Sequence, residues 1–269
     1  MTSSSSFTRL SKHAALAAVI AASTFAVPYA SAAGAKPTVV LVHGAFADSS
    51  SWDGVIAKLE QDGYTVMAAA NPLRSVKGDG AYVASLLKSI PGSVVLVGHS
   101  YGGSVISAAA AGAANVKALV YVAAFAPEAG ETAVGLSGKF PGSTLGPTLA
   151  PPVALADGGK DLYIQQDKFP AQFAADVPAA KAKLMASGQR PITDAALNEA
   201  SPAPAWKNIP SWFIYGTADK NIPPASQDFM AKRAKSKDTV VIKGASHVVM
   251  TSHPAEVAKL IEAAAAAAK

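Results

Sequence analysis

Cysteine is absent from all 269 residues of the sequence. The chain therefore has no disulfide bond and no cysteine that could carry a lipid anchor. Charge is scarce as well, because charged residues make up 15% of the chain and the net charge of +5 is scattered along it. Such a small and dispersed excess of basic residues does not predict nucleic-acid binding.

The sequence also lacks the patterns that bind cofactors and metals. No Gly-x-Gly-x-x-Gly follows the first predicted strand, and the chain has no His-x-x-x-His pair. After residue 32, no apolar stretch is long enough to anchor the protein in a bilayer. We therefore expect no cofactor, no metal ion and no stable membrane anchor in the mature protein.

The first 32 residues follow the order of a secretory signal peptide. Arg9 and Lys12 form a short basic region, residues 14–27 are apolar, Pro28 ends that run, and small residues follow at 30–32. This order predicts a signal peptide over residues 1–32, a mature domain over 33–269, and a periplasmic or secreted protein. A buried N-terminal helix is the alternative.

Half of the residues are hydrophobic, and beyond residue 37 they fall into short runs. Runs rich in β-branched residues alternate with helical segments, which is typical of an α/β fold with a mostly parallel sheet and helices on both faces. The predicted strands span residues 38–42, 64–69, 93–97, 118–122, 211–215 and 239–242. The predicted helices span residues 52–61, 80–90, 102–113, 224–234 and 254 to the end.

The alternation stops between about residues 127 and 204. This stretch carries scattered prolines and glycines, a helical piece at 179–187, and apolar side chains such as Phe140, Phe169 and Met185. A long insertion with apolar residues of its own is typical of a lid over a pocket, so we predict a small, mainly helical cap. The alternative is a loop-rich surface that the same residues pack.

The segment Gly98-His99-Ser100-Tyr101-Gly102 has the form Gly-x-Ser-x-Gly. A buried strand is predicted to end just before it, and a helix of small residues to begin at its end. This strand–turn–helix setting is that of a nucleophile elbow, where small neighbours let the chain turn tightly. We therefore predict Ser100 as a nucleophile, and the alternative is a structural serine that caps the helix.

A serine hydroxyl needs a base to become an effective nucleophile. His247 lies in the loop after the last predicted strand, and the exits of parallel strands gather at the same edge of a sheet as the elbow. Asp219 follows the strand predicted at 211–215 and completes the chain order Ser–Asp–His. We predict Ser100, Asp219 and His247 as a catalytic triad.

The other candidates for base and acid fit this geometry less well. His43 belongs to the exit of the first strand, and His253 starts the final helix, where we expect it at the surface. His99 lies within the elbow, so its side chain should point away from that of Ser100. The aspartates of the insertion follow no predicted strand, and a lone aspartate usually caps a helix or is solvated.

Acyl transfer also needs two hydrogen-bond donors for the oxyanion that forms on the attacked carbonyl. In folds with such an elbow, one donor is the N–H of the residue after the nucleophile, here Tyr101. The other donor comes from the loop after an early strand. We predict Ala45 as the second donor, with Phe46 as the alternative. Gly44 would allow the backbone to turn toward the site.

Together these segments resemble the α/β-hydrolase superfamily over essentially the whole mature chain. The sequence is most similar to the branch that holds plant methylesterases and hydroxynitrile lyases. Three passages carry this similarity, namely Val42-His43-Gly44-Ala45, Tyr121-Val122-Ala123-Ala124-Phe125-Ala126-Pro127 and Lys243-Gly244-Ala245-Ser246-His247. The resemblance implies the α/β-hydrolase fold with its cap.

Two positions separate the esterases of this branch from its lyases. The resemblance implies that a lyase has threonine after the first-loop histidine and lysine after the catalytic histidine, whereas this chain has Gly44 and Val248. Valine cannot supply positive charge to a departing cyanide. We therefore expect a serine hydrolase that cleaves a small-molecule carboxylic ester through an acyl-enzyme. A lyase or other carbon–carbon cleaving enzyme on the same triad, and a non-catalytic ligand-binding homologue, are the alternatives.

Overall fold

The computed structural model describes residues 1–2 and 36–268, and residues 34–269 belong to one folding unit. The predicted signal peptide lies outside the described residues except for its first two, so it stays a prediction. Within the folding unit, six strands form a sheet in the order β2-β1-β3-β4-β8-β9, and all neighbours in it are parallel. The predicted α/β fold with a mostly parallel sheet is confirmed.

The strands of this sheet match the predicted apolar runs closely. They are β1 (Thr38–Val42), β2 (Val66–Ala69), β3 (Val94–His99), β4 (Val116–Val122), β8 (Ser211–Gly216) and β9 (Thr239–Ile242). Every residue of β3 and β8 is buried, because helices cover both faces of these strands. Burial on both faces explains why these strands read as continuous apolar runs instead of alternating patterns.

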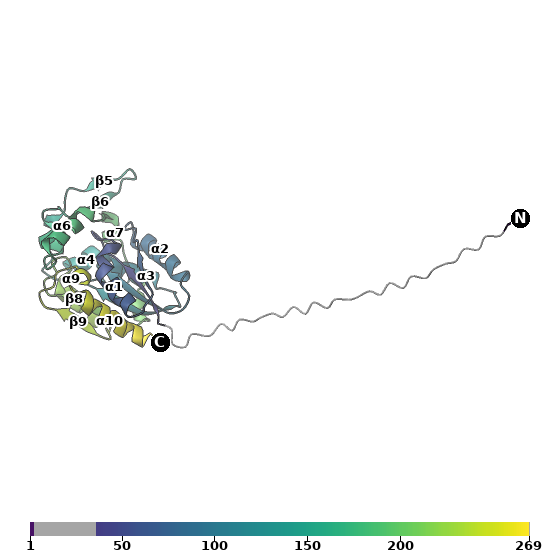
Figure 1. Ribbon diagram of the computed structural model, residues 1–269. Helices are drawn as coiled ribbons and strands as arrows, with labels where there is room; N and C mark the ends of the chain where they lie inside the picture. The colour runs from purple at the N-terminus through teal and green to yellow at the C-terminus, as the bar shows by residue number, and fades with distance from the viewer. Residues whose placement is uncertain (3–35, 269) are drawn as a thin grey trace. The chain divides into compact units, whose positions relative to one another are not determined.

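Helices flank the sheet on two sides (Figure 1). Helices α1 (Asp53–Gln61) and α10 (Pro254–Ala267) pack together on one side, and α2 (Val76–Lys88) packs against α3 (Tyr101–Ala109) on the other. Both α3 and α10 contact β3 and β4, so the centre of the sheet is covered from both faces. Helices α8 (Pro224–Arg233) and α9 (Val249–Ser252) complete this part of the fold.

Two helix boundaries differ from the prediction for identifiable reasons. Helix α2 begins at Val76 instead of residue 80, because the Ser75 hydroxyl accepts a hydrogen bond from the Gly78 N–H at 2.9 Å and caps the helix. Glycines at positions 78 and 80, near the start of the helix, concealed that start. Helix α3 ends at Ala109 instead of residue 113, just before Gly112 adopts a positive φ of 80°.

The segment predicted as a cap, about residues 127–204, is here called the cap segment. Figure 1 shows it at one end of the main sheet. Helical elements predominate in it, but three short strands also form an antiparallel sheet, in the order β5-β6-β7. Strands of two or three residues carry no alternation that a sequence could reveal. The elements are α4 (Ala133–Gly138), η2 (Gly146–Thr148), β5 (Val153–Ala154), β6 (Lys160–Leu162), α5 (Phe169–Phe173), α6 (Ala179–Gly188), β7 (Ile192–Thr193) and α7 (Asp194–Asn198).

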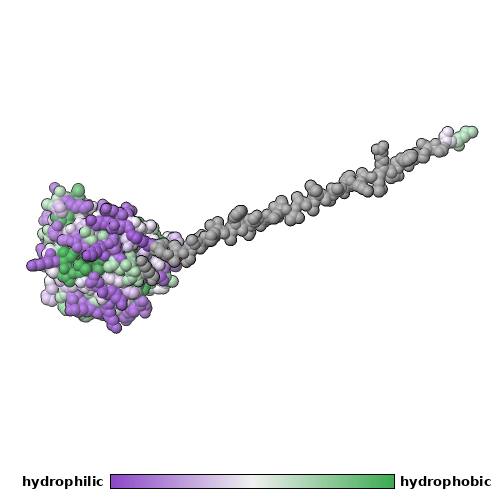
Figure 2. Space-filling view, turned by 60° about the horizontal axis from the view of Figure 1, so that its bottom comes forward, coloured by the Kyte–Doolittle hydropathy of each residue, from purple (hydrophilic) through white to green (hydrophobic). Residues whose placement is uncertain are grey.

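Hydrophilic residues cover most of the face shown in Figure 2, around a smaller hydrophobic area. In the described range 36–268, the exposed large hydrophobic side chains come from different elements, namely Tyr82, Val134, Val153, Leu184 and Val241. None of the helices in that range combines the length and hydrophobicity that crossing a membrane requires.

Candidate active site

Ser100 lies at the sharp turn between β3 and α3, with φ of 54° and ψ of −124°. A non-glycine residue rarely adopts this conformation, which persists only where the surroundings enforce it. The neighbouring glycines explain how they do so. A Cβ on Gly98 would lie 2.6 Å from the Gly102 carbonyl oxygen, and one on Gly102 would lie 2.5 Å from the Val42 carbonyl oxygen. The Gly-x-Ser-x-Gly pattern is thus a packing requirement of this turn.

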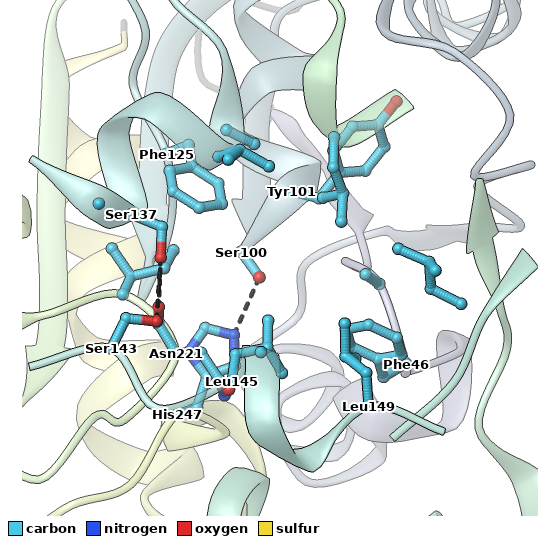
Figure 3. A pocket seen from close by; sticks show the side chains of 18 of the residues that line it. Phe46, Ser100, Tyr101, Phe125, Ser137, Ser143, Leu145, Leu149, Asn221 and His247 are labelled. Atoms are coloured by element: carbon cyan, nitrogen blue, oxygen red, sulfur yellow. Dashed lines mark hydrogen bonds between the residues drawn. The ribbon is translucent and has the colours of Figure 1, made fainter. Parts of the chain in front are cut away.

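The structure brings the three predicted triad residues together, and Figure 3 shows the hydrogen bond between two of them, Ser100 and His247. The Ser100 hydroxyl lies 2.9 Å from His247 Nε2, and His247 Nδ1 lies 2.7 Å from Asp219 Oδ2. Because a carboxylate only accepts, the Nδ1 atom carries the proton and Nε2 is free to accept one from the serine. All three side chains are buried, at the exits of β3, β8 and β9.

Four hydrogen bonds fix the orientation of Asp219. Its Oδ1 atom accepts the N–H groups of Asn221 and Ile222 at 2.8 and 3.0 Å. Its Oδ2 atom accepts Gln227 Nε2 at 2.9 Å in addition to His247. Gln227 was not predicted, because it comes from α8 and nothing in the local sequence marks it as a partner of Asp219.

His99 contacts the base instead of the nucleophile. Its Nε2–H donates to the His247 carbonyl oxygen at 3.2 Å. Complete burial holds the pKa of His99 well below its usual value, so the ring is neutral. The two imidazole rings lie 4.8 Å apart between centroids. His99 therefore links the elbow to the histidine loop, a contact that the sequence did not reveal.

The cap segment holds the histidine loop from the other side. The buried Ser246 hydroxyl donates to Asp176 Oδ1, and His253 Nε2 lies 3.5 Å from Asp176 Oδ2. His253 precedes α10 and is partly exposed, near the surface position expected for it. Asp176 follows α5 in the chain. The residue before His247 is thus hydrogen-bonded to a carboxylate 70 positions upstream.

The loop after β1, here called the first loop, is in close contact with the elbow. A Cβ on Gly44 would lie 2.6 Å from Ser100 Cβ and 2.7 Å from the His99 carbonyl oxygen, so only glycine fits there. His43 Nδ1–H donates to the Gly44 carbonyl oxygen at 3.0 Å, and His43 Nε2 accepts the Asn71 N–H at 3.1 Å. Burial lowers the pKa of His43 to about 4. His43 is thus a neutral structural residue at this site.

The two alternatives for the second oxyanion donor differ in this loop. Phe46 has a positive φ of 60°, and its N–H donates to the Arg190 carbonyl oxygen at 3.0 Å. Within residues 36–268, no acceptor pairs with the N–H groups of Ala45 or Tyr101. Both of these residues line the cavity in front of Ser100. The geometry therefore leaves Ala45 and Tyr101 free to donate and engages Phe46 elsewhere.

A cavity of about 330 Å³ opens in front of Ser100 and His247. Phe46, Phe125 and Phe173 form aromatic parts of its wall, and the cap segment adds leucines at 145, 149, 162 and 197. Among the described residues, its lining includes no lysine, arginine, aspartate or glutamate. In the same part of the chain, no group of three or more histidine or acidic side chains is arranged to hold a metal ion.

Comparisons with known proteins agree with this architecture. The alpha/beta hydrolase nvfD of Aspergillus novofumigatus (strain IBT 16806) is 26% identical to the chain over 250 residues, which are 86% of this chain and 97% of that protein. The structure of polyneuridine aldehyde esterase matches with a TM-score of 0.74 at 20% identity, over 85% of this chain and 99% of that one.

The predicted resemblance to plant methylesterases is confirmed at the level of fold. The Arabidopsis methylesterase MES16 matches with a TM-score of 0.68 at 19% identity, over 86% of this chain and 99% of that one. The model of the Alpha/beta hydrolase family matches residues 39–260, from the first strand of the sheet into its last helix. With this match and the parallel sheet that carries the elbow, the chain belongs to the Alpha/beta hydrolase family.

Proposed function

We propose that the protein is a serine hydrolase that cleaves carboxylic esters. The observation that carries this proposal is the continuous hydrogen-bond chain from Asp219 through His247 to Ser100, which ends at an uncharged cavity. Two proteins of similar structure are named as an esterase and a methylesterase, which supports the same reaction. An uncharged, largely apolar cavity favours neutral esters of small molecules over charged ones.

In the proposed mechanism, Ser100 attacks the ester carbonyl while His247 Nε2 takes the hydroxyl proton. The carboxylate of Asp219 keeps the proton on Nδ1 and stabilises the imidazolium that forms. The N–H groups of Ala45 and Tyr101 donate to the oxyanion. His247 then protonates the leaving alcohol, and a water molecule repeats these steps on the acyl-enzyme to release the acid.

The structure favours ester hydrolysis over cyanohydrin cleavage. Val248, the residue after His247, is fully buried and apolar, so it supplies no positive charge to a departing cyanide. Within the described residues, no basic side chain other than His247 lines the cavity. Gly44 leaves no hydroxyl beside Ser100 at the position where the related lyases carry threonine.

The proposal is tested with mature protein, beginning at Ala33, and a series of p-nitrophenyl esters. We expect hydrolysis by the parent, loss of nearly all activity in Ser100→Ala, and labelling by a fluorophosphonate at Ser100. Ser104→Ala is the matched control, because Ser104 is also buried, lies one helical turn further along α3 and has a hydroxyl without a partner. Undiminished activity in Ser100→Ala, or labelling at another serine, would refute the assignment.

The same protein distinguishes the two other functions. Release of cyanide from mandelonitrile faster than ester turnover would identify a lyase. Tight binding of an ester without any turnover would identify a ligand-binding homologue. We expect no cyanide release, because Val248 is buried and apolar and the described cavity lining has no basic side chain other than His247. We expect turnover and not mere binding, because the hydrogen-bonded triad is complete.

We further propose that the protein is exported by a cleavable signal peptide over residues 1–32. The order of the basic, apolar and small residues in the sequence supports this proposal. Expression of the full chain in a bacterium, followed by N-terminal sequencing of the secreted or periplasmic protein, tests it. We expect a mature chain that begins at Ala33, and a cytoplasmic chain with residues 1–32 intact would contradict the proposal.

A further inference from the structure

The Tyr101 side chain leaves the active site and ends on a buried carboxylate. In Figure 3 its ring extends away from Ser100, with the hydroxyl at the far end. This hydroxyl donates to Asp79 Oδ2 at 2.9 Å, and both residues are buried. The proposed mechanism uses only the backbone N–H of Tyr101, so it assigns no role to this side-chain pair.

Asp79 is held firmly relative to α3. The Arg74 N–H lies 3.2 and 3.1 Å from its two carboxylate oxygens, and Asp79 itself lies in the first turn of α2. The partial positive charge at that end of a helix stabilises a carboxylate. Next to Asp79, α2 approaches α3 so closely that a Cβ on Gly80 would lie 2.9 Å from Ala108 Cβ.

The loop that carries Arg74 is fixed in turn by the cap segment. Arg74 Nη1 lies 2.6 Å from Asp161 Oδ1 in β6, and the Thr193 hydroxyl of β7 donates to the Arg74 carbonyl oxygen at 2.8 Å. Leu73, which adopts a positive φ of 63°, accepts the Thr193 N–H at 3.2 Å. The cap segment therefore fixes the loop whose N–H donates to Asp79.

The Tyr101 N–H needs such an anchor. The preceding residue, Ser100, is in a strained conformation, and within the described residues the Tyr101 N–H has no acceptor of its own. A rotation of the peptide between them would turn this N–H away from the oxyanion. A displacement of the first residue of α3 would move this N–H as well, and the hydrogen bond from the Tyr101 hydroxyl to Asp79 opposes such a displacement.

The burial of Asp79 is costly if it serves packing alone. Burial raises its pKa, although its bonds to Arg74 and Tyr101 partly offset that effect. Apolar side chains of similar volume usually fill such a position at lower cost. A retained buried carboxylate is therefore consistent with a requirement for a fixed acceptor at this position.

We propose that Asp79 is a positioning residue, which holds the Tyr101 N–H toward the oxyanion by accepting the Tyr101 hydroxyl. The proposal rests on the proposed ester hydrolysis, because the oxyanion forms in that reaction. Asp79 touches no reacting atom. Its effect is confined to the transition state, where the oxyanion exists, and leaves the binding of the ground-state ester unchanged.

The test compares Tyr101→Phe with Tyr121→Phe in the mature protein. Each variant removes one buried tyrosine hydroxyl, because the Tyr121 hydroxyl pairs with the Ser107 hydroxyl at 2.8 Å away from the cavity. Loss of an oxyanion donor costs about 10²–10³ in kcat, so we expect a displaced donor in Tyr101→Phe to cost about tenfold. We expect an unchanged KM in both variants and an unchanged kcat in Tyr121→Phe.

Affinity for a trifluoromethyl ketone provides a second readout, because this inhibitor forms an oxyanion on Ser100 as the transition state does. We expect its Ki to rise by the same factor as kcat falls in Tyr101→Phe. Asp79→Ala in the Tyr101→Phe background should cause little further loss of kcat, since the bond between Tyr101 and Asp79 is already absent. Asp79→Ala also removes the acceptor of the Arg74 N–H, and we expect that loss to lower the melting temperature. A melting temperature for each variant separates this effect from general loss of stability.

The outcomes separate the two proposals. If Tyr101→Phe keeps the kcat and Ki of Tyr121→Phe while Ser100→Ala is inactive, the positioning role is wrong and ester hydrolysis stands. A change in KM alone, or in melting temperature alone, would also overturn the positioning role. If Ser100→Ala is as active as the parent, the proposed hydrolysis itself fails.

Discussion

Replacement of Gly44 by alanine tests whether the first loop supplies an oxyanion donor. The added Cβ would lie 2.6 Å from Ser100 Cβ, whereas carbon atoms in contact are separated by about 3.5–4.0 Å. The elbow cannot yield, because Ser100 is already strained and glycines pack tightly around it. The loop must therefore retreat by about 1 Å, the difference between these separations.

That retreat is large on the scale of a hydrogen bond. A bond of about 2.9 Å from the Ala45 N–H to the oxyanion would lengthen to about 3.9 Å, beyond hydrogen-bonding distance. Loss of one oxyanion donor typically costs about 10²–10³ in kcat, or about 2.7–4 kcal/mol. We expect Gly44→Ala to lose activity in this range, with KM much less affected.

The assay is the hydrolysis of p-nitrophenyl butyrate, with kcat and KM measured separately and a melting curve for each variant. Gly188→Ala is the control, because Gly188 ends α6 and a Cβ there meets no atom within 4 Å. It should keep the parent's kcat. A Gly44→Ala protein with undiminished kcat would show that the Ala45 N–H does not act on the oxyanion.

Three further predictions follow from the site. Asp219→Asn should lower kcat about 10⁴-fold. Two backbone N–H groups hold the amide oxygen, so the NH2 group turns toward His247, which then adopts the wrong tautomer. Measurement of kcat for neutral esters as a function of pH checks this. Acid should destabilise the protein between pH 6.5 and about 4, because the unfolded chain protonates His43 in that range while the native state, with a His43 pKa of about 4, does not. This shift corresponds to about 3 kcal/mol of unfolding free energy, measurable by urea unfolding at several pH values. His43→Gln should reduce the pH dependence without abolishing it, because His99 is also buried and neutral in the native state. Leu149→Trp should fill part of the cavity and slow p-nitrophenyl octanoate more than the acetate, and equal slowing of both esters would contradict the assigned position of Leu149.

Topology explains why the sequence predicted the meeting of the three triad residues. Ser100, Asp219 and His247 each directly follow or lie near the exit of a parallel strand, and such exits gather at one edge of a sheet. Short apolar runs revealed those strands, and β3 and β8 form continuous apolar runs because both of their faces are buried. The chain order then left few alternatives.

The supporting contacts could not be predicted in this way. No sequence pattern marks Asp79 as a partner of Tyr101, and the bond between them arises because α2 and α3 pack side by side. Gln227 and Asp176 reach the triad region from a helix and from the cap segment, at distances along the chain that no local pattern sets. Packing between elements determines such contacts, and a sequence pattern describes one element at a time.

The order of the strands has a consequence for how activity is lost. The nucleophile follows β3 in the middle of the sheet, but the base lies in the loop after β9, the outermost strand. Strand β9 has four residues and is only partly buried, whereas β3 is buried throughout. Local opening of proteins begins at such sparsely packed margins. The enzyme is therefore expected to lose its base by fraying of this edge while Ser100 is still in place. Catalysis would then report the integrity of the β9 edge of the sheet before the fold as a whole unfolds.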